Sequence, residues 1–396
     1  MSSQTRTALV IGGGIAGTIT AMALRQAGIE ATVHEAYSST ADGIGGGLSL
    51  APNGVNALDA IGAGDVVRAV GIPMRGTVLK SGDGELIGEI SLPSELPPSR
   101  FVWRGALYRA LYDEAARRGI RTLHDQRVVG AEDTGDGVRA HFADGSHADA
   151  DILIGTDGIR STVRTLIDPA APQPQYAGLL GFAAQLGDTG LASTEGKLHV
   201  AYGKRGSFGY LVHEDSSGGW FVNLPHPEPM TLAEARAVGN EQWLSVLREA
   251  FADDHSPAAG LLRRSDPADL LITGPLETMP TVPTWSRGRM VLVGDAVHAA
   301  SPSSGQGASQ AIESSVQLAR CLRDLPYEEA FAAYELLRRE RVERIIEGAT
   351  RTNASKAGAR GASEIKPENM DWQFEYRIDW DAPVTGAEYA AATPAQ

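Results

Sequence analysis

The sequence predicts an α/β protein: a Rossmann-like nucleotide-binding domain interleaved with a domain built on an antiparallel sheet, plus a C-terminal helix and an extended tail. Three observations predict this fold class. A glycine-rich strand, turn and helix open the chain, two later apolar strands each run into an acidic turn, and aromatic strand-like segments lie between those two. At 396 residues, 42% of them hydrophobic, the chain is also too long for one ordinary core.

The chain opens with a strand, a turn and a helix. Thr7–Ile11 is apolar and β-branched, the glycine-rich turn Gly12–Gly17 follows, and a helical pattern then runs to about Ala27. A second strand, Ala31–His34, leads to Glu35. This order and spacing match a dinucleotide-binding fingerprint.

Each glycine of the turn has a physical task. Gly12 makes the tight bend, Gly14 lets the backbone approach a pyrophosphate, and Gly17 lets the helix pack closely on the strand. The N–H groups of Ile15 and Ala16, at the helix start, then face the phosphates. The acid after the second strand accepts hydrogen bonds from ribose hydroxyls and repels a 2′-phosphate, so FAD or NAD suits this site better than NADP.

Two later strands also run into turns. The stretch Asp151–Arg164 reads as a strand, a small turn and a polar helix start. The stretch Met290–His298 is another buried strand, which ends on Asp295. Beyond it, Pro302 and Gly305–Gly307 lead into a helix with one apolar face.

With these motifs the chain resembles the FAD-dependent aromatic hydroxylases, the single-component flavoprotein monooxygenases of the para-hydroxybenzoate hydroxylase type. The glycine fingerprint, a DG motif at Asp157-Gly158 and a GD motif at Gly294-Asp295 occur in the family's order, and the resemblance spans most of residues 7–350. It implies noncovalent FAD that is reduced by NADPH or NADH. O2 then adds to form a flavin C4a-hydroperoxide, which hydroxylates or epoxidises an electron-rich aromatic or alkene.

The resemblance and the local patterns together predict the cofactor-binding residues. An acid at a strand end accepts hydrogen bonds from ribityl hydroxyls, and a glycine-rich helix start puts N–H groups near the flavin N1 and C2 carbonyl. In relatives an arginine contacts FAD, and one strand backbone lies near the adenine. The predicted set is Gly12, Gly14, Ile15, Ala16, Gly17, Glu35, Gly47, Arg104, Val128, Asp157, Gly294, Asp295, Pro302, Gly305, Gly307 and Ala308.

Two features limit the assignment of side-chain roles. Where relatives often carry Gly-x-Asn and then Glu-Asp, this chain has Gly307-Ala308-Ser309 and Glu313-Ser314, so no side-chain contact is assigned to Ser309. His298 follows Asp295 closely, but no oriented acid or base partner can be named for it, which favours packing over catalysis. No catalytic side chain is assigned, because the flavin performs the chemistry.

The substrate is expected against the antiparallel sheet, whose strands begin near Tyr176. Phe208, Tyr210 and Val212 share one face of a strand because side chains alternate, and Trp220 lies on the next strand. These four are the candidate substrate contacts, although aromatic residues on such a strand also commonly fill the core. The sequence does not decide which face lines the pocket.

The C-terminal part is predicted to be a helix from Pro326 to about Gly348 and then an extended segment. From Met370 to Trp380, six apolar residues alternate strictly with polar ones, so one face must be buried. The interleaved division places FAD-binding parts at residues 1–75, 100–172 and 276–324. Residues 76–99 and 173–275 form the substrate domain, and residues 325–396 form the C-terminal helix and tail.

Composition excludes several other classes. Lys plus Arg total 35 and Asp plus Glu 49, a net charge of −14, which disfavours nucleic acid and anionic membranes as partners. The lone cysteine, Cys321, cannot form an internal disulfide or a cysteine-rich metal site and suits a reducing cytoplasm. Neither a signal peptide, a membrane span nor a metal-ligand cluster is evident. The expected partners are a small aromatic or unsaturated substrate and O2, and the oligomeric state is not predicted.

Two other functions remain open. A flavin-dependent reductase or oxidase on the same fold would act without oxygen insertion, and a flavin-binding module would not turn over at all.

Overall fold

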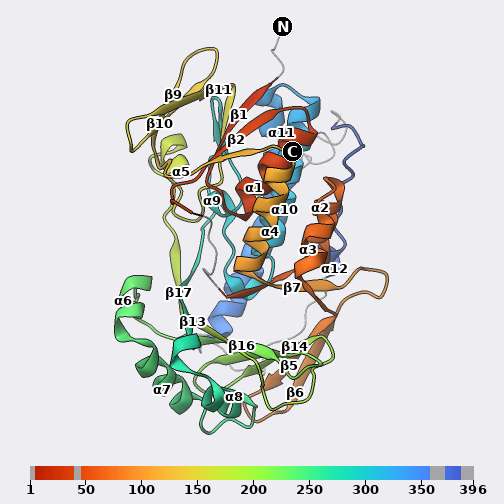
Figure 1. The fold of residues 1–396 in the computed structure, drawn as a ribbon, viewed down its shortest axis with the longest axis vertical. Helices are drawn as coiled ribbons and strands as arrows, with labels where there is room; N and C mark the ends of the chain where they lie inside the picture. The colour runs from red at the N-terminus through yellow and green to blue at the C-terminus, as the bar shows by residue number, and fades with distance from the viewer. Residues whose placement is uncertain (1–4, 40–45, 357–370, 385–396) are drawn as a thin grey trace, which may run out of the picture.

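The computed structural model describes residues 5–39, 46–356 and 371–384. A nucleotide-binding part with the parallel strands occupies one end of the elongated molecule, and a large sheet with three helices occupies the other (Figure 1). The predicted fold class is confirmed.

The upper part is built on a six-stranded sheet of order β18-β19-β12-β1-β2-β8. Its strands are β1 (Thr7–Ile11), β2 (Glu30–His34), β8 (Arg121–Leu123), β12 (Ile152–Gly155), β18 (Ser286–Arg287) and β19 (Met290–Leu292). All neighbours run parallel except β18 and β19. The carboxyl ends of β1, β12 and β19 therefore lie side by side, and each carries one of the three predicted motifs.

Helices and two small sheets surround this sheet. The helices are α1 (Ile15–Gln26), α2 (Pro52–Ala60), α3 (Gly64–Val70), α4 (Arg104–Arg117), α5 (Thr162–Ile167), α9 (Asp295–His298), α10 (Gly307–Asp324) and α11 (Tyr327–Lys356), with the 3-10 turn η2 (Pro302–Ser304). One small sheet has the order β11 (His147–Ala150), β10 (Val138–Phe142), β9 (Val128–Asp133), and the other β3 (Gly47–Leu50), β7 (Ser99–Trp103), β4 (Ile72–Met74). Helix α10 packs against α1, α2 and α11, so it lies at the centre of this part.

The lower part is a seven-stranded sheet of order β17-β13-β16-β15-β14-β5-β6. Its strands are β5 (Gly76–Ser81), β6 (Leu86–Ser91), β13 (Gln175–Leu186), β14 (Lys197–Tyr202), β15 (Ser207–Val212), β16 (Gly218–Pro225) and β17 (Leu271–Thr278). Neighbours run antiparallel except β14 and β5. Three helices, α6 (Leu232–Val238), α7 (Asn240–Ala250) and α8 (Ala258–Arg264), and the 3-10 turn η1 (Pro267–Asp269) complete it.

One face of this sheet packs on those helices and forms a second core. Phe208, Tyr210, Val212 and Trp220 are all buried there, together with Trp243 and other helix residues. The ring centroids of Phe208 and Trp220 lie 5.6 Å apart. The four side chains fill the space between sheet and helices, which favours the core packing left open for them by the sequence over a contact with substrate.

The C-terminal segment also differs from its predicted form. Asp371–Phe374 is a short helix, α12, where a strand was expected, and Met370 lies outside the described residues. From Tyr376 the predicted one-sided burial does hold, since Tyr376, Ile378 and Trp380 pack on the main core. No strand lies beside the segment among the described residues to pair with it; arginine side chains donate to its carbonyl oxygens instead.

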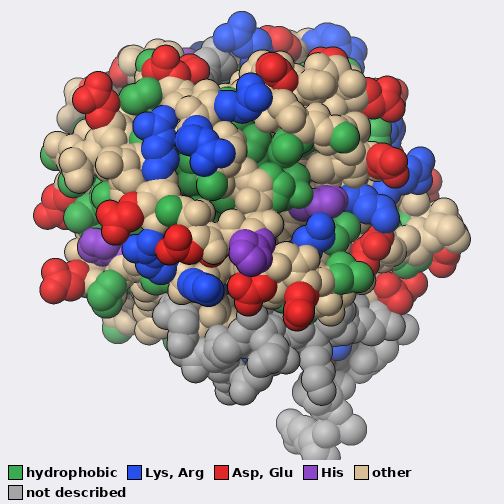
Figure 2. Space-filling model, turned by 90° about the horizontal axis from the view of Figure 1, so that it is seen from below, with side chains coloured by type: hydrophobic (Ala, Val, Ile, Leu, Met, Phe, Trp, Pro, Cys, Tyr) green, Lys and Arg blue, Asp and Glu red, His purple; other side chains and the backbone are tan. Residues whose placement is uncertain are grey.

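The face of the molecule in Figure 2 carries side chains of both charges. Seen from below in Figure 2, acidic and basic side chains are interspersed and apolar side chains appear in small groups. No helix in the described part of the chain is long and apolar enough to span a bilayer.

Candidate functional site

The first two motifs are in direct contact. Gly12 has a φ of +101°, and a Cβ at this position would lie 2.7 Å from the Thr156 carbonyl oxygen and 2.9 Å from the Cα of Asp157. The Thr156 hydroxyl donates to the Ile11 and Gly12 carbonyl oxygens at 2.8 and 2.9 Å. The glycine turn therefore fits against the DG turn with no room for a side chain.

Two glycines of the fingerprint have opposite surroundings. A Cβ at Gly17 would lie 1.8 Å from the Gly12 carbonyl oxygen, so α1 packs tightly on the turn. At Gly14 the nearest atom to such a Cβ is the Tyr108 hydroxyl, 3.6 Å away. Gly14, which precedes Ile15 and Ala16 at the start of α1, thus presents open backbone, as a phosphate site requires.

Glu35 is held beside this turn. Its Oε2 accepts a hydrogen bond from the Gly13 N–H at 2.6 Å, and its Oε1 accepts one from the Tyr37 N–H at 3.0 Å. The Gln126 N–H donates to the Glu35 carbonyl oxygen, which brings β9 and its first residue, Val128, to the same corner of the site. Each Glu35 oxygen keeps a lone pair for a ribose hydroxyl.

The Asp157 side chain has a structural task. Its carboxylate accepts hydrogen bonds from the Ser161 hydroxyl at 2.5 Å and from the N–H groups of Thr162 at 2.7 Å and Val163 at 3.1 Å. These bonds fix the start of α5 and occupy the carboxylate. A contact between Asp157 and a cofactor would therefore be made by its backbone.

Arg164, which sequence reasoning did not single out, joins the DG turn to the GD turn. This 1% exposed side chain donates through Nη1 to the Ala296 carbonyl oxygen at 2.9 Å and through Nη2 to the Ile159 carbonyl oxygen at 2.8 Å. Its position seven residues after the DG aspartate was the only sequence signal for this role.

The GD turn places a free carboxylate at the site. Gly294 has a φ of +67°, and a Cβ there would lie 3.0 Å from the Ala16 Cβ. Asp295 is exposed, and no hydrogen bond from another described residue reaches its carboxylate. Surrounding protein disfavours the charged form and raises the pKa of Asp295, while the positive charge of Arg104 opposes that shift.

His298, three residues further on, is buried. It is 4% exposed, and its Nε2 lies 2.8 Å from the Ser314 hydroxyl. Burial first, and the Arg338 charge second, lower the pKa of His298 to about 3, so the imidazole is neutral at physiological pH. This placement agrees with packing and leaves no route to general acid–base catalysis.

The turn before α10 provides backbone for a flavin ring. Pro302 begins η2, Gly305 has a φ of +62° that suits glycine, and Gly307 and Ala308 open α10. Ser309, which stands where relatives carry asparagine, faces α2: its hydroxyl oxygen accepts a hydrogen bond from the Ala51 N–H at 3.1 Å. This bond joins the start of α2 to α10.

Two further predicted residues lie beside these turns. Gly47 opens β3, where a Cβ would lie 2.2 Å from the Phe101 ring. Arg104 opens α4 and donates to the Tyr108 hydroxyl at 3.1 Å, so its guanidinium lies on the same side of the site as the open backbone at Gly14.

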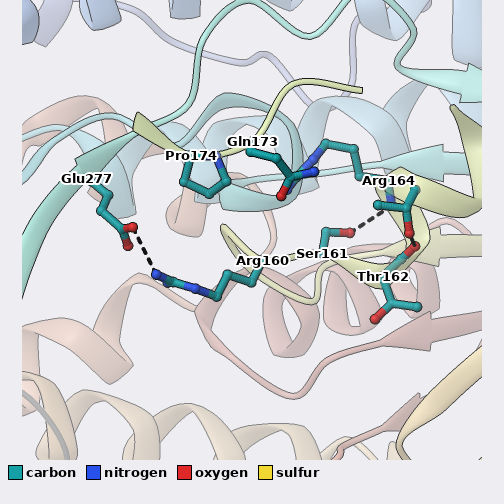
Figure 3. Close-up of a pocket in the computed structure, with 8 residues that line it drawn as sticks. Arg160, Ser161, Thr162, Arg164, Gln173, Pro174 and Glu277 are labelled. Atoms are coloured by element: carbon teal, nitrogen blue, oxygen red, sulfur yellow. Dashed lines mark hydrogen bonds and ion pairs between the residues drawn. The ribbon is translucent and has the colours of Figure 1, made fainter. Parts of the chain in front are cut away.

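A cavity of about 480 Å³ lies between the DG turn and the lower sheet. Arg160, Ser161, Thr162, Arg164, Thr165, Gln173, Pro174 and Glu277 line it (Figure 3). Arg160 and Glu277 form an ion pair at 2.8 Å, and Figure 3 shows their side chains meeting across the hollow. Among the described residues no group of three metal-ligating side chains occurs here or elsewhere.

The residues of the three turns fit FAD. The open backbone at Gly14 suits a pyrophosphate, Glu35 a ribose, Asp295 a hydroxylated chain and the start of α10 an anionic ring edge. The fold and site define a flavin-dependent oxidoreductase. A model of the FAD binding domain family matches residues 5–207 and 278–349, and the chain belongs to this family.

Relatives with named activities match nearly the whole chain. An FAD-dependent urate hydroxylase from Klebsiella pneumoniae is 32% identical over 86% of this chain and 87% of its own. The 6-hydroxynicotinate 3-monooxygenase of Pseudomonas fluorescens is 31% identical over 98% of this chain and 100% of its own. The crystal structure of Klebsiella pneumoniae HpxO with FAD and uric acid aligns with a TM-score of 0.79 at 27% identity, covering 90% of each chain. The protein is an FAD-dependent monooxygenase of the aromatic-hydroxylase family, as its three motifs predicted.

Proposed function

We propose that the protein uses NADPH or NADH and O2 to hydroxylate or epoxidise a small, electron-rich aromatic or alkene. The observation that carries this proposal is the convergence of the three turns at one edge of the parallel sheet, where the exposed Asp295 carboxylate has no hydrogen-bond partner among the described residues. Relatives that act on urate and 6-hydroxynicotinate support an aromatic substrate. Bound FAD supplies the oxygen chemistry.

The side chains bind and orient rather than transfer protons. The Asp295 carboxylate would accept hydrogen bonds from the ribityl hydroxyls of FAD, and Arg104 balances its charge. The N–H groups of Gly307 and Ala308 stabilise negative charge on the ring edge, because they lie at the start of the 18-residue helix α10.

The substrate pocket belongs to the other face of the lower sheet. That face carries small residues, and a Cβ at Gly219 would lie 3.2 Å from the Trp103 ring beside Arg104. A Cβ at Gly46, next to β3, would lie 3.5 Å from Ala183 on the same sheet. These small residues let the two parts of the molecule approach closely beside Arg104, and we place the substrate ring along this boundary.

The nicotinamide dinucleotide docks transiently, since only one dinucleotide fingerprint is present. The cavity at the DG turn suits its phosphates, because the exposed Arg160 guanidinium and the hydroxyls of Ser161 and Thr162 line it. We also place the protein in the cytoplasm, a location that the single, buried Cys321 supports.

A screen of aromatic metabolites tests this function. Purified protein with FAD should oxidise NADPH or NADH several-fold faster in the presence of one class of aromatic compound, with matching O2 uptake. A protein that binds FAD but shows no stimulation by any aromatic would contradict the proposal and favour a flavin-binding module. Stimulation without O2 uptake would favour a reductase.

A further inference from the structure

A buried ionic cluster lies under the α10 end of the flavin site. Glu313 and Arg338 both have fully buried side chains, and Glu313 Oε2 accepts hydrogen bonds from Arg338 Nη1 at 2.5 Å and Arg341 Nε at 2.9 Å. A second bond joins Arg341 Nη2 to Glu313 Oε1 at 3.0 Å. Burial disfavours the carboxylate, but the two guanidinium groups outweigh it and hold the pKa of Glu313 below its ordinary value. One carboxylate thus joins two cations in the interior.

The cluster reaches the flavin turn through amide side chains. Glu313 Oε1 also accepts from Asn53 Nδ2 at 2.5 Å, and the same Nδ2 donates to Gln306 Oε1 at 3.0 Å. Gln310 Nε2 donates to both Gln306 and Glu313 at 3.3 Å, while Arg338 Nη2 donates to Gln310 Oε1 at 2.5 Å. Gln306 is 1% exposed and immediately precedes Gly307. Its side chain is therefore fixed on the side away from solvent, which holds the backbone that opens α10.

On its outer side the cluster binds the C-terminal segment, residues 371–384. Arg341 Nη1 donates to the Trp372 carbonyl oxygen at 2.9 Å, and Nη2 donates to the Gln373 carbonyl oxygen at 2.7 Å. Its guanidinium carbon lies 4.3 Å from the centre of the Tyr376 ring. The same side chain of Arg341 therefore binds Glu313 inside and the C-terminal segment outside.

We propose that Glu313 and Arg341 are positioning residues for FAD, and that the docked C-terminal segment maintains their geometry. Arg341 is only 10% exposed while the segment covers it. Without that cover, water would reach the Arg341–Glu313 pair and weaken its attraction, and Arg341 would lose both carbonyl partners. The amides that Glu313 orders, Asn53 and Gln306, would then hold the flavin turn less firmly. The C-terminal segment thus contributes to FAD binding although no cofactor motif lies in it.

Substitutions of Arg341 test this inference, with Arg344 as a matched control. Arg344 lies 3.9 Å from the centre of the Trp372 ring but has no bond to Glu313, so Arg344→Met removes a contact with the segment and leaves the ionic cluster intact. Arg341→Met removes both links, and Arg341→Lys keeps the charge but loses the two-pronged geometry. The Lys variant is the one more certain to fold.

The measurements are the FAD dissociation constant of the apoprotein and the reduction potential of bound flavin at saturating FAD. We expect Arg341→Met to weaken FAD about tenfold and to shift the potential, Arg341→Lys to do so by a smaller factor, and Arg344→Met to stay within about twofold. A chain that ends at residue 370 should behave like Arg341→Met.

Three outcomes would overturn the inference. The first is that both Arg341 variants keep the FAD affinity and the reduction potential of the parent, even if their melting temperatures fall. The second is that Arg344→Met and Arg341→Met have equal effects, and the third is that the truncated chain binds FAD as the parent does. The inference depends only on FAD binding. If the protein binds FAD but transfers no oxygen to a substrate, the proposed function is contradicted and this inference is not.

Discussion

Gly17→Ala should destabilise the apoprotein, whereas Gly14→Ala should leave its stability nearly unchanged. At Gly17 the new Cβ would lie 1.8 Å from the Gly12 carbonyl oxygen, where real contacts are almost never below 3.0 Å. The helix α1 or the turn must therefore move by at least 1.2 Å. Overpacking of this kind costs about 1–3 kcal/mol, which corresponds to a melting temperature lower by about 2–4 °C for each kcal/mol in a domain of ordinary size.

At Gly14 the protein itself has room. The nearest atom to an added Cβ is 3.6 Å away, and the backbone φ of −70° suits any residue. The apoprotein should therefore keep its stability within about 0.5 kcal/mol. FAD affinity should nevertheless fall, because the methyl group occupies the space through which a pyrophosphate approaches the backbone.

Calorimetry of the apoproteins and FAD titration followed by flavin fluorescence separate the two effects. We expect Gly17→Ala to lower both stability and affinity, and Gly14→Ala to lower affinity alone. Full FAD affinity in Gly14→Ala would refute the placement of the phosphates. An apoprotein of Gly17→Ala as stable as the parent would refute the packing argument.

Three further predictions concern single side chains. Asp295→Ala should weaken FAD by about 1–3 kcal/mol, the usual cost of a lost buried hydrogen bond; the isosteric Asp295→Asn should recover part of the loss in the same titration, and unchanged affinity in the Ala variant would count against the site. Arg160→Ala should raise the KM for NADPH or NADH several-fold at unchanged FAD affinity, whereas equal KM values in parent and variant would remove the cavity of Figure 3 from the account. Lys356→Met should raise the melting temperature at pH 7 relative to the parent. Burial lowers the pKa of Lys356 to about 8 in the folded state, so the folded chain bears the cost of the charged amine below pH 8 and is relieved of it as the pH rises towards 10. The advantage of the variant should therefore shrink between pH 8 and 10, while the exposed Lys204→Met shows none; an advantage independent of pH would contradict this reasoning.

The local elements of the nucleotide-binding part were predictable because each one has a strong local signal. The first strand and helix, Thr7–Ile11 and Ile15–Gln26, match the predicted ranges to within a residue or so. Gly12 has a positive φ and Gly17 a close backbone contact, and both conditions favour glycine over any other residue. The three motifs could be placed together because parallel strands bring their carboxyl ends to one edge.

The failures share a physical cause, which is that a periodic pattern shows that a face is buried but not what covers it. The alternation at Phe208 and Tyr210 belongs to the face under α7 and α8, helices that no strand pattern reveals. The alternation in the C-terminal segment predicted a strand, yet arginines from α10 and α11 bind its backbone. Arg164 and Glu313 were missed because their partners are distant in sequence, which spacing cannot show.

Isotopic labelling tests the central claim most directly. The FAD-loaded protein is first mixed with the aromatic compound that stimulates cofactor oxidation most strongly. It is then reduced with NADPH or NADH and exposed to ¹⁸O₂ for a single turnover. We expect one ¹⁸O atom in each molecule of organic product, detected by mass spectrometry. A product without label, with all the labelled oxygen recovered as hydrogen peroxide or water, would contradict it.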